Sequence, residues 1–155
     1  MRRHPRLTTL AAFGLLVAVG LLAAACGGSG DAPALSDVRI GRPAGPNGAM
    51  YLTAEGYGTV DRLTGATTDV ADSVETHESF MGADGTMGMR PLDGFDLPAD
   101  GALVLEPGGL HLMLINVDRL DVGDKVKVTL HWESAGDMEV EAEVVDPADA
   151  GQGGQ

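Results

Sequence analysis

Six side chains that can bind soft or borderline metal ions fall within one stretch of 37 residues near the middle of this chain. They are His77, Met81, Met87, Met89, His111 and Met113, in a chain with only four His and seven Met. Methionine sulfur selects Cu(I), and imidazole binds copper in either oxidation state. The single Cys lies outside this stretch, at Cys26. Thioether and imidazole without thiolate therefore predict a copper-handling protein.

The spacing of these residues suits strands that converge on one ion. His111 and Met113 are two positions apart in residues 110–115, a segment that predicts a strand. Residues at i and i+2 of a strand point to the same face, about 6.6 Å apart along the backbone. Met87 and Met89 have the same relation. Two such pairs on neighbouring strands, together with His77, predict a four-coordinate cluster at one end of the fold. The side chains of His111 and Met113 are expected there at a partly exposed loop end.

Several of the His and Met residues also have a plain structural explanation. Met50 and Met138 are predicted to fill the core, the usual role of methionine beside strands. His131 falls on the polar face of its predicted strand and is expected at the surface. Met81 and Met87 either add sulfur close to the metal or serve in packing. The candidate ligands are therefore His77, Met89, His111 and Met113.

Alternation of apolar and polar residues predicts an all-β fold. Val126, Val128, Leu130 and Trp132 alternate with polar residues, and residues 138–144 repeat the pattern after a turn at 134–136, which predicts a β-hairpin. Further strands are predicted at 38–40, 49–54, 61–67, 73–79, 87–90, 102–105 and 110–116. No segment has the periodicity of an amphipathic helix. Short strands separated by Gly and Pro turns predict one β-sandwich or barrel domain.

The first 25 residues have the features of an export signal. Arg2, Arg3 and Arg6 precede an apolar segment of 16 residues, 10–25, whereas a membrane-spanning helix needs roughly 20. Cys26 follows three alanines and resembles the lipidated Cys of the bacterial lipoprotein lipobox, with Ala23 where that motif usually has Leu. The alternative is ordinary Ala-x-Ala cleavage nearby, which would leave a free thiol.

The chain is accordingly divided into four segments. Residues 1–25 are predicted to be a signal peptide of the lipoprotein type, and 26–36 a flexible tether. Residues 37–146 form the β-sandwich domain. The tail 147–155 has nothing to bury and is predicted to be disordered. The protein is expected to be exported, to the outer face of the cell membrane as a lipoprotein or to the periplasm.

The charge and composition exclude several classes of protein. The formal net charge is −13, and it becomes −16 without the three arginines of residues 1–25, which argues against binding nucleic acid or anionic lipid headgroups. Any attachment to a membrane is therefore expected through a lipid anchor. Blue-copper electron transfer needs a Cys ligand, and the single Cys lies in the predicted tether, which argues against a blue-copper protein. The sequence also contains no nucleophile elbow and no Cys-His arrangement, so no enzyme is predicted.

The metal-ligand residues resemble the motif of the periplasmic copper chaperones of the PCu(A)C type. That motif is a His, about ten residues, a Met, twenty-one residues and His-x-Met. Met89-x21-His111-x-Met113 matches it, and His77 precedes Met89 by eleven intervening residues, the additional one being assigned to the turn at 82–85. The segments Met87-Gly88-Met89-Arg90-Pro91 and Glu106-Pro107-Gly108-Gly109-Leu110-His111 are also similar to the family, and the likeness covers residues 36–146.

The resemblance implies a cupredoxin-like Greek-key β-sandwich that binds Cu(I) through His77, Met89, His111 and Met113. It implies a carrier that delivers copper outside the cytoplasm to an acceptor cuproprotein, such as the dinuclear copper subunit of cytochrome oxidase or its assembly factor. A monomer is expected. Two alternatives stay open: a protein that sequesters Cu(I) for copper tolerance, and a metal-free interaction β-sandwich.

Overall fold

The computed structural model describes residues 31–151, in which all the regular secondary structure is β-strand. The predicted signal peptide and Cys26 lie outside the described residues. Within 31–151 there is no helix long and apolar enough to cross a bilayer. The strands are β1 (Ala34–Gly41), β2 (Gly48–Glu55), β3 (Asp61–Thr68), β4 (Ser73–Met81), β5 (Met87–Pro91), β6 (Phe95–Leu97), β7 (Ala102–Leu105), β8 (Leu110–Ile115), β9 (Lys125–Trp132) and β10 (Gly136–Val145).

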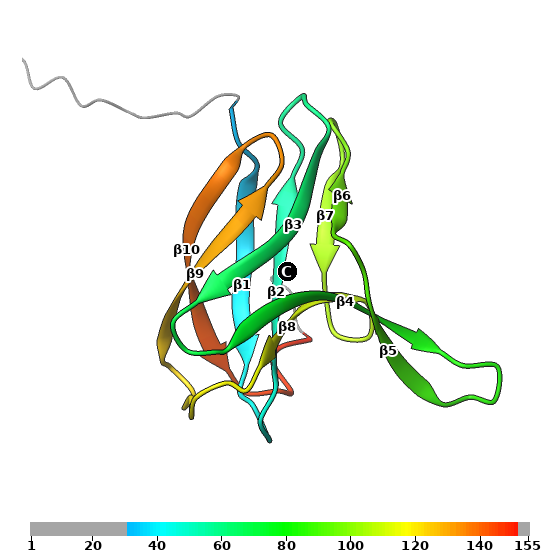
Figure 1. Ribbon diagram of the computed structural model, residues 1–155, viewed down its shortest axis with the longest axis vertical. Helices are drawn as coiled ribbons and strands as arrows, with labels where there is room; N and C mark the ends of the chain where they lie inside the picture. The colour runs from blue at the N-terminus through cyan, green and yellow to red at the C-terminus, as the bar shows by residue number, and fades with distance from the viewer. Residues whose placement is uncertain (1–30, 152–155) are drawn as a thin grey trace, which may run out of the picture.

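Seven of these strands form a barrel-like sheet (Figure 1). Around it the order is β3, β4, β8, β2, β1, β10 and β9, and β9 pairs with β3 to complete the ring. The contact between β3 and β4 is a short one, at Ala66 and Val74. β1 and β10 are parallel, and the other pairs are antiparallel. The prediction of a single all-β domain is confirmed.

The core of the barrel follows the alternation seen in the sequence. Val126, Val128, Leu130 and Trp132 of β9 are buried, whereas Lys125 and Lys127 between them are exposed. The core also includes Met50, which is fully buried, and Met138 packs against its edge. Both methionines therefore have the packing role predicted for them. Burial of these apolar side chains is the main source of stability in a chain without disulfides among its described residues.

Three features differ from the expected layout. β6 was not predicted, although Phe95 and Leu97 are both buried where it pairs with β3. β1 begins at Ala34, inside the predicted tether, and contains an irregularity between Ser36 and Arg39. The predicted tail also begins with an ordered turn: Ala150 is 2% exposed, and its carbonyl accepts a hydrogen bond from Arg39 Nε at 2.8 Å. Within the turn, the N–H groups of Asp149 and Ala150 donate hydrogen bonds to the Asp146 carbonyl.

A buried carboxylate joins two loops at one end of the barrel. Asp61 is 6% exposed and accepts hydrogen bonds from the backbone N–H groups of Arg62, Ser134 and Ala135 and from the Tyr57 hydroxyl. Burial by itself would raise the pKa of Asp61, but these four donors outweigh it and the pKa lies below its ordinary value. The β2–β3 loop and the β9–β10 turn are thereby held to the same residue.

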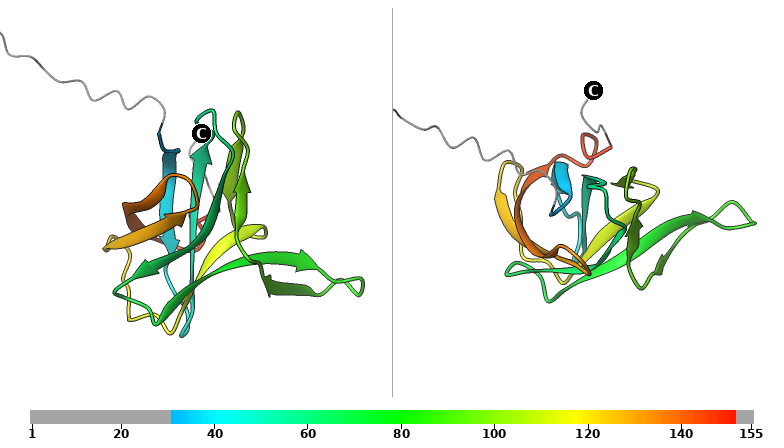
Figure 2. Two further views of the ribbon diagram at one scale, coloured as in Figure 1. Left: turned by 45° about the horizontal axis from the view of Figure 1, so that its top comes forward. Right: turned by 90° about the horizontal axis from the view of Figure 1, so that it is seen from above.

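The hairpin of β4 and β5 extends beyond the barrel (Figure 1 and both views of Figure 2). β4 pairs with β8 in its first part and with β5 in its second part, from His77 to Met81. We call the outer part of this hairpin, residues 79–89, the arm. Its turn is closed by a hydrogen bond from the Gly82 N–H to the Thr86 carbonyl, at 2.7 Å. The arm places one end of the candidate ligand set outside the barrel.

Candidate metal centre

The strand register places all four candidate ligands on one face of the β5–β4–β8 sheet. His77 of β4 is paired with His111 of β8, and Met113 lies two residues further along β8. Met89 of β5 is paired with Ser79, two residues after His77 in β4. Directly paired residues, and residues two apart in one strand, point to the same face. We call this face the metal face.

The position of this cluster differs from the one predicted. The ligands were expected at one end of the sandwich, with His111 and Met113 in a partly exposed loop end. Both residues instead lie within β8, and His111 is only 3% exposed. The difference arises because β8 pairs with β4 along the segment that contains both residues, and strand pairing cannot be obtained from local spacing.

His77 has one engaged and one free ring nitrogen. Its Nε2 lies 2.9 Å from Glu75 Oε2. Because a carboxylate only accepts hydrogen bonds, Nε2 carries a proton, and in the neutral ring the lone pair is on Nδ1. Nδ1 is buried and has no hydrogen-bond partner within the described residues. A buried nitrogen lone pair without a donor is costly in a fold, and a metal ion at Nδ1 would satisfy it.

His111 is prepared in the complementary way. Its Nδ1 is 3.1 Å from the Gly109 carbonyl, so Nδ1–H donates there and Nε2 has the lone pair. The same carbonyl accepts the Ser79 N–H at 3.0 Å, which ties the β7–β8 loop to β4. Burial lowers the pKa of His111 below its ordinary value. The ring is therefore neutral at pH 7, the form in which imidazole binds metals.

The two rings are close enough to share an ion. Their centroids are 5.9 Å apart and their planes are tilted by 54°. Glu75 supports this pair as the carboxylate partner of His77, an arrangement that orients the ring of a metal-binding histidine and strengthens its basicity. Glu75 was not among the residues predicted from the sequence. The available signal was that Glu75 precedes His77 by two residues in a predicted strand and so shares its face.

The methionines differ in how far they are covered. Met113 is half-buried beside Glu75 on the neighbouring strand. Met89 is 56% exposed. The residues predicted either to add sulfur or to pack, Met81 and Met87, are 64% and 59% exposed, so neither is packed in the core. The donors range from a buried imidazole to sulfur at the surface, and an ion bound among them would be accessible from the arm.

The opposite face of the arm has its own packing. Phe80 lies over Gly88, where an added Cβ would come within 2.7 Å of the Phe80 ring. The Arg90 guanidinium lies 5.5 Å from the centroid of the same ring and donates two hydrogen bonds to Glu78. This packing of a phenyl ring on a strand glycine is known to stabilise sheet edges. It holds Met87 and Met89 on the metal face without using any ligand residue.

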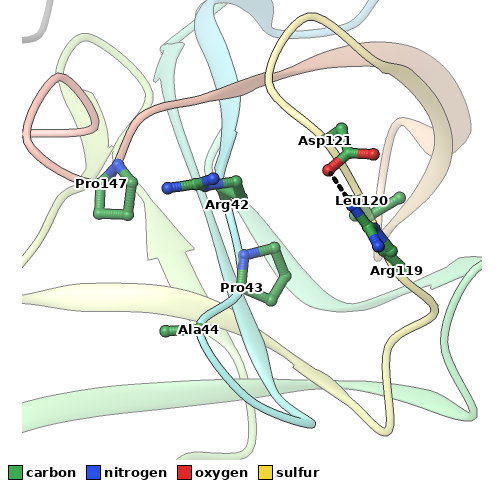
Figure 3. A pocket seen from close by; sticks show the side chains of 7 residues that line it. All are labelled: Arg42, Pro43, Ala44, Arg119, Leu120, Asp121 and Pro147. Atoms are coloured by element: carbon green, nitrogen blue, oxygen red, sulfur yellow. Dashed lines mark hydrogen bonds and ion pairs between the residues drawn. The ribbon is translucent and has the colours of Figure 1, made fainter.

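Other polar sites lie away from this cluster. His131 of β9 is bonded to Asp137 and Thr67, at 2.7 and 3.2 Å, on the outer surface as predicted. A pocket of about 340 Å³ lies beside the β1–β2 loop (Figure 3). It contains Arg42 and Arg119 but none of the candidate ligands. Each guanidinium has a carboxylate partner, Asp146 or Asp121, so the pocket has little unbalanced positive charge.

Comparison with known proteins agrees with this arrangement. Residues 33–144 match the model of the family described as "Putative lipoprotein LpqE-like". The chain belongs to the LpqE-like family. A relative, "Putative lipoprotein Lxx21020" of Leifsonia xyli subsp. xyli, is 33% identical over 85 residues, which are 54% of this chain and 51% of the relative. The chain thus spans about half the length of that curated relative.

Solved structures place this LpqE-like protein with the PCuAC domains. The copper-bound PCuAC domain from PmoF2 matches with a TM-score of 0.60 and 23% identity, over 73% of this chain and 92% of that one; at this identity the match establishes the fold. The solution structure of CuI-DR1885 from Deinococcus radiodurans matches with a TM-score of 0.59 and 26% identity, over 79% and 83% of the two chains. The resemblance to the PCuAC type is confirmed.

Proposed function

We propose that this protein is an extracytoplasmic Cu(I) carrier that holds one ion between His77, Met89, His111 and Met113. The observation that supports it best is the buried Nδ1 of His77, which has no hydrogen-bond partner among residues 31–151, in a ring whose centroid is 5.9 Å from that of His111. Both rings present a lone pair, and both methionines lie on the same face.

The donor set favours Cu(I) over harder ions. Two thioethers and two imidazoles suit a soft monovalent ion, whereas Mg²⁺ and Ca²⁺ prefer oxygen ligands. Unlike thiolates, thioethers do not form disulfides in an oxidising compartment. They also bind copper less tightly than thiolates, so copper can move on to a thiolate-containing acceptor. We therefore assign the protein a carrier role without catalysis, with the dinuclear copper site of cytochrome oxidase, or its assembly factor, as the acceptor.

Copper transfer to an acceptor tests this role. The Cu(I)-loaded protein is mixed anaerobically with an apo fragment that contains the oxidase copper site, and the ion is followed by absorption. We expect transfer to near completion, at a rate that rises with acceptor concentration because acceptor thiolates enter as His or Met ligands leave. Copper that stays on this protein with excess acceptor would instead favour the sequestration function. A rate equal to spontaneous release at every acceptor concentration would contradict a docking step.

We further propose that a lipid on Cys26 anchors the carrier at the outer face of the cell membrane. The support is the lipobox-like sequence before Cys26 and the lipoprotein descriptions of the family and of its Leifsonia relative. The acidic surface leaves the acyl chains as the source of membrane affinity. The wild-type protein should partition into the detergent phase, and Cys26→Ser should abolish this partition. A wild-type protein found in the aqueous phase, with another residue at its N-terminus, would refute the anchor.

A further inference from the structure

Three methionines of the arm are exposed well beyond what packing requires. The exposed fractions of Met81, Met87 and Met89 are 64%, 59% and 56%. Large apolar side chains that cluster at a surface usually mark a site of interaction. The proposed carrier site uses only Met89 of these three. The exposure of Met81 and Met87 is therefore left without a role by the function proposed above.

The register brings the three side chains together. Met81 and Met87 are directly paired across the arm, and Met89 is two residues along β5 on the same face. Directly paired residues have Cβ atoms about 4.5–5.5 Å apart, a separation that flexible methionine side chains can easily bridge. An open surface hollow of about 260 Å³ is lined by Met87 and Met89 together with Ser79 and Gly88, and Met81 lies outside this lining. There is thus space beside Met87 and Met89 for a bound ion.

The turn of the arm keeps the pair in place. Gly82 and Thr86 close it through a backbone hydrogen bond of 2.7 Å, directly next to Met81 and Met87. Asp84 Oδ1 accepts hydrogen bonds from the Thr86 N–H and hydroxyl, at 3.2 and 2.7 Å. Gly85 has a φ of +80°, which favours glycine at this position. Met81 and Met87 are therefore presented by an ordered turn.

We propose that Met81, Met87 and Met89 form a second soft-metal site, in which three thioethers bind one Cu(I) or Ag(I) ion. Methionine sulfur selects such ions over hard cations. Binding at this site does not depend on the function proposed above. We also propose that copper enters the carrier at this site, and this role rests on the proposed function because Met89 belongs to both sites. An ion taken up at the arm passes inward as His77, His111 and Met113 replace Met81 and Met87, with no change of oxidation state.

Silver binding to a protein without its histidine ligands tests the proposal. Ag(I) is the probe because it is soft, monovalent and not oxidised by air. The full-length His77→Ala/His111→Ala protein should still bind about one equivalent of Ag(I), measured by calorimetry with a competing ligand. Adding Met81→Leu and Met87→Leu should weaken this binding at least about tenfold. Leucine preserves apolar volume, so the loss would report on sulfur and not on the apolar surface. Met138→Leu in the same background is the matched control and should change nothing.

The possible outcomes separate this proposal from the carrier function. Absent Ag(I) binding in the double-histidine protein, or binding unchanged by the two leucines, would overturn the arm site. If the double-histidine protein is not folded by circular dichroism, His77→Ala alone, which retains the buried His111, replaces it. A wild-type protein that binds Cu(I) no more tightly than the histidine variants would contradict the carrier site and leave the arm site intact.

Discussion

Replacing His77 by Ala should weaken Cu(I) binding at least about 100-fold, or about 2.7 kcal/mol. The substitution removes the ring whose buried Nδ1 has no hydrogen-bond partner among the described residues. The site would therefore lose a nitrogen ligand that the folded protein already holds in position. The side chain of His77 is 14% exposed and lies outside the core cluster. The protein is therefore expected to remain folded. The measurement is anaerobic competition with a Cu(I) chelator, with circular dichroism to verify the fold.

A graded series of variants makes this result specific. Glu75→Ala removes only the carboxylate that orients His77, and we expect a smaller loss of about tenfold, in the range known for such supporting residues. His131→Ala is the control, since His131 is bonded to Asp137 and Thr67 away from the metal face. Wild-type affinity in both His77→Ala and His111→Ala proteins would refute the ligand assignment. An equal loss in His131→Ala would point to a general effect on the fold.

Asp61→Asn should destabilise the protein by about 2–4 kcal/mol at pH 7. The two carboxylate oxygens accept four hydrogen bonds, three of them from backbone N–H groups. An asparagine places an NH₂ group against at least one of these donors, and the buried polar atoms are left unpaired. The measurement is urea unfolding of the wild type and the variant. Asp69→Asn, at an exposed carboxylate, should change the stability by less than about 0.5 kcal/mol.

The effect of Asp61 should also depend on pH in a defined direction. Its pKa is lowered in the folded protein, so the ionised form is favoured by folding. The stabilisation is then complete above the unfolded pKa of about 4 and is lost as the pH falls through the folded value. The difference between wild type and Asp61→Asn should shrink below about pH 4. A difference that stays constant down to pH 2 would contradict the hydrogen-bonded carboxylate.

The sequence predicted those parts of the fold that depend on local pattern. The alternation in β9 and β10 identified the hairpin, because a strand with one buried face must repeat every two residues. β6 was missed because three residues are too few to show such a period. The ordered turn at Ala150 was missed because it depends on Arg39, 111 residues away in the sequence. Contacts of that kind require the tertiary structure.

The candidate site was predicted to a similar extent. Residue type and spacing selected His77, Met89, His111 and Met113, and the structure brings them to one face; their role as ligands stays a prediction. For Glu75 the i, i+2 spacing places it on the same face as His77, but its supporting role follows only from the hydrogen bond between the two side chains. The free nitrogen of each ring likewise follows from its partner, a carboxylate in one case and a backbone carbonyl in the other.

The packing of Phe80 on Gly88 limits how this site could be moved into other proteins. A β-hairpin engineered with the methionines alone would lack the ring that fixes the glycine strand and the Glu78–Arg90 pair that holds the ring. Any larger residue between Met87 and Met89 would displace that ring. The transferable unit is therefore both faces of the hairpin: one face packs and fixes the strands, and the other presents the metal-binding methionines.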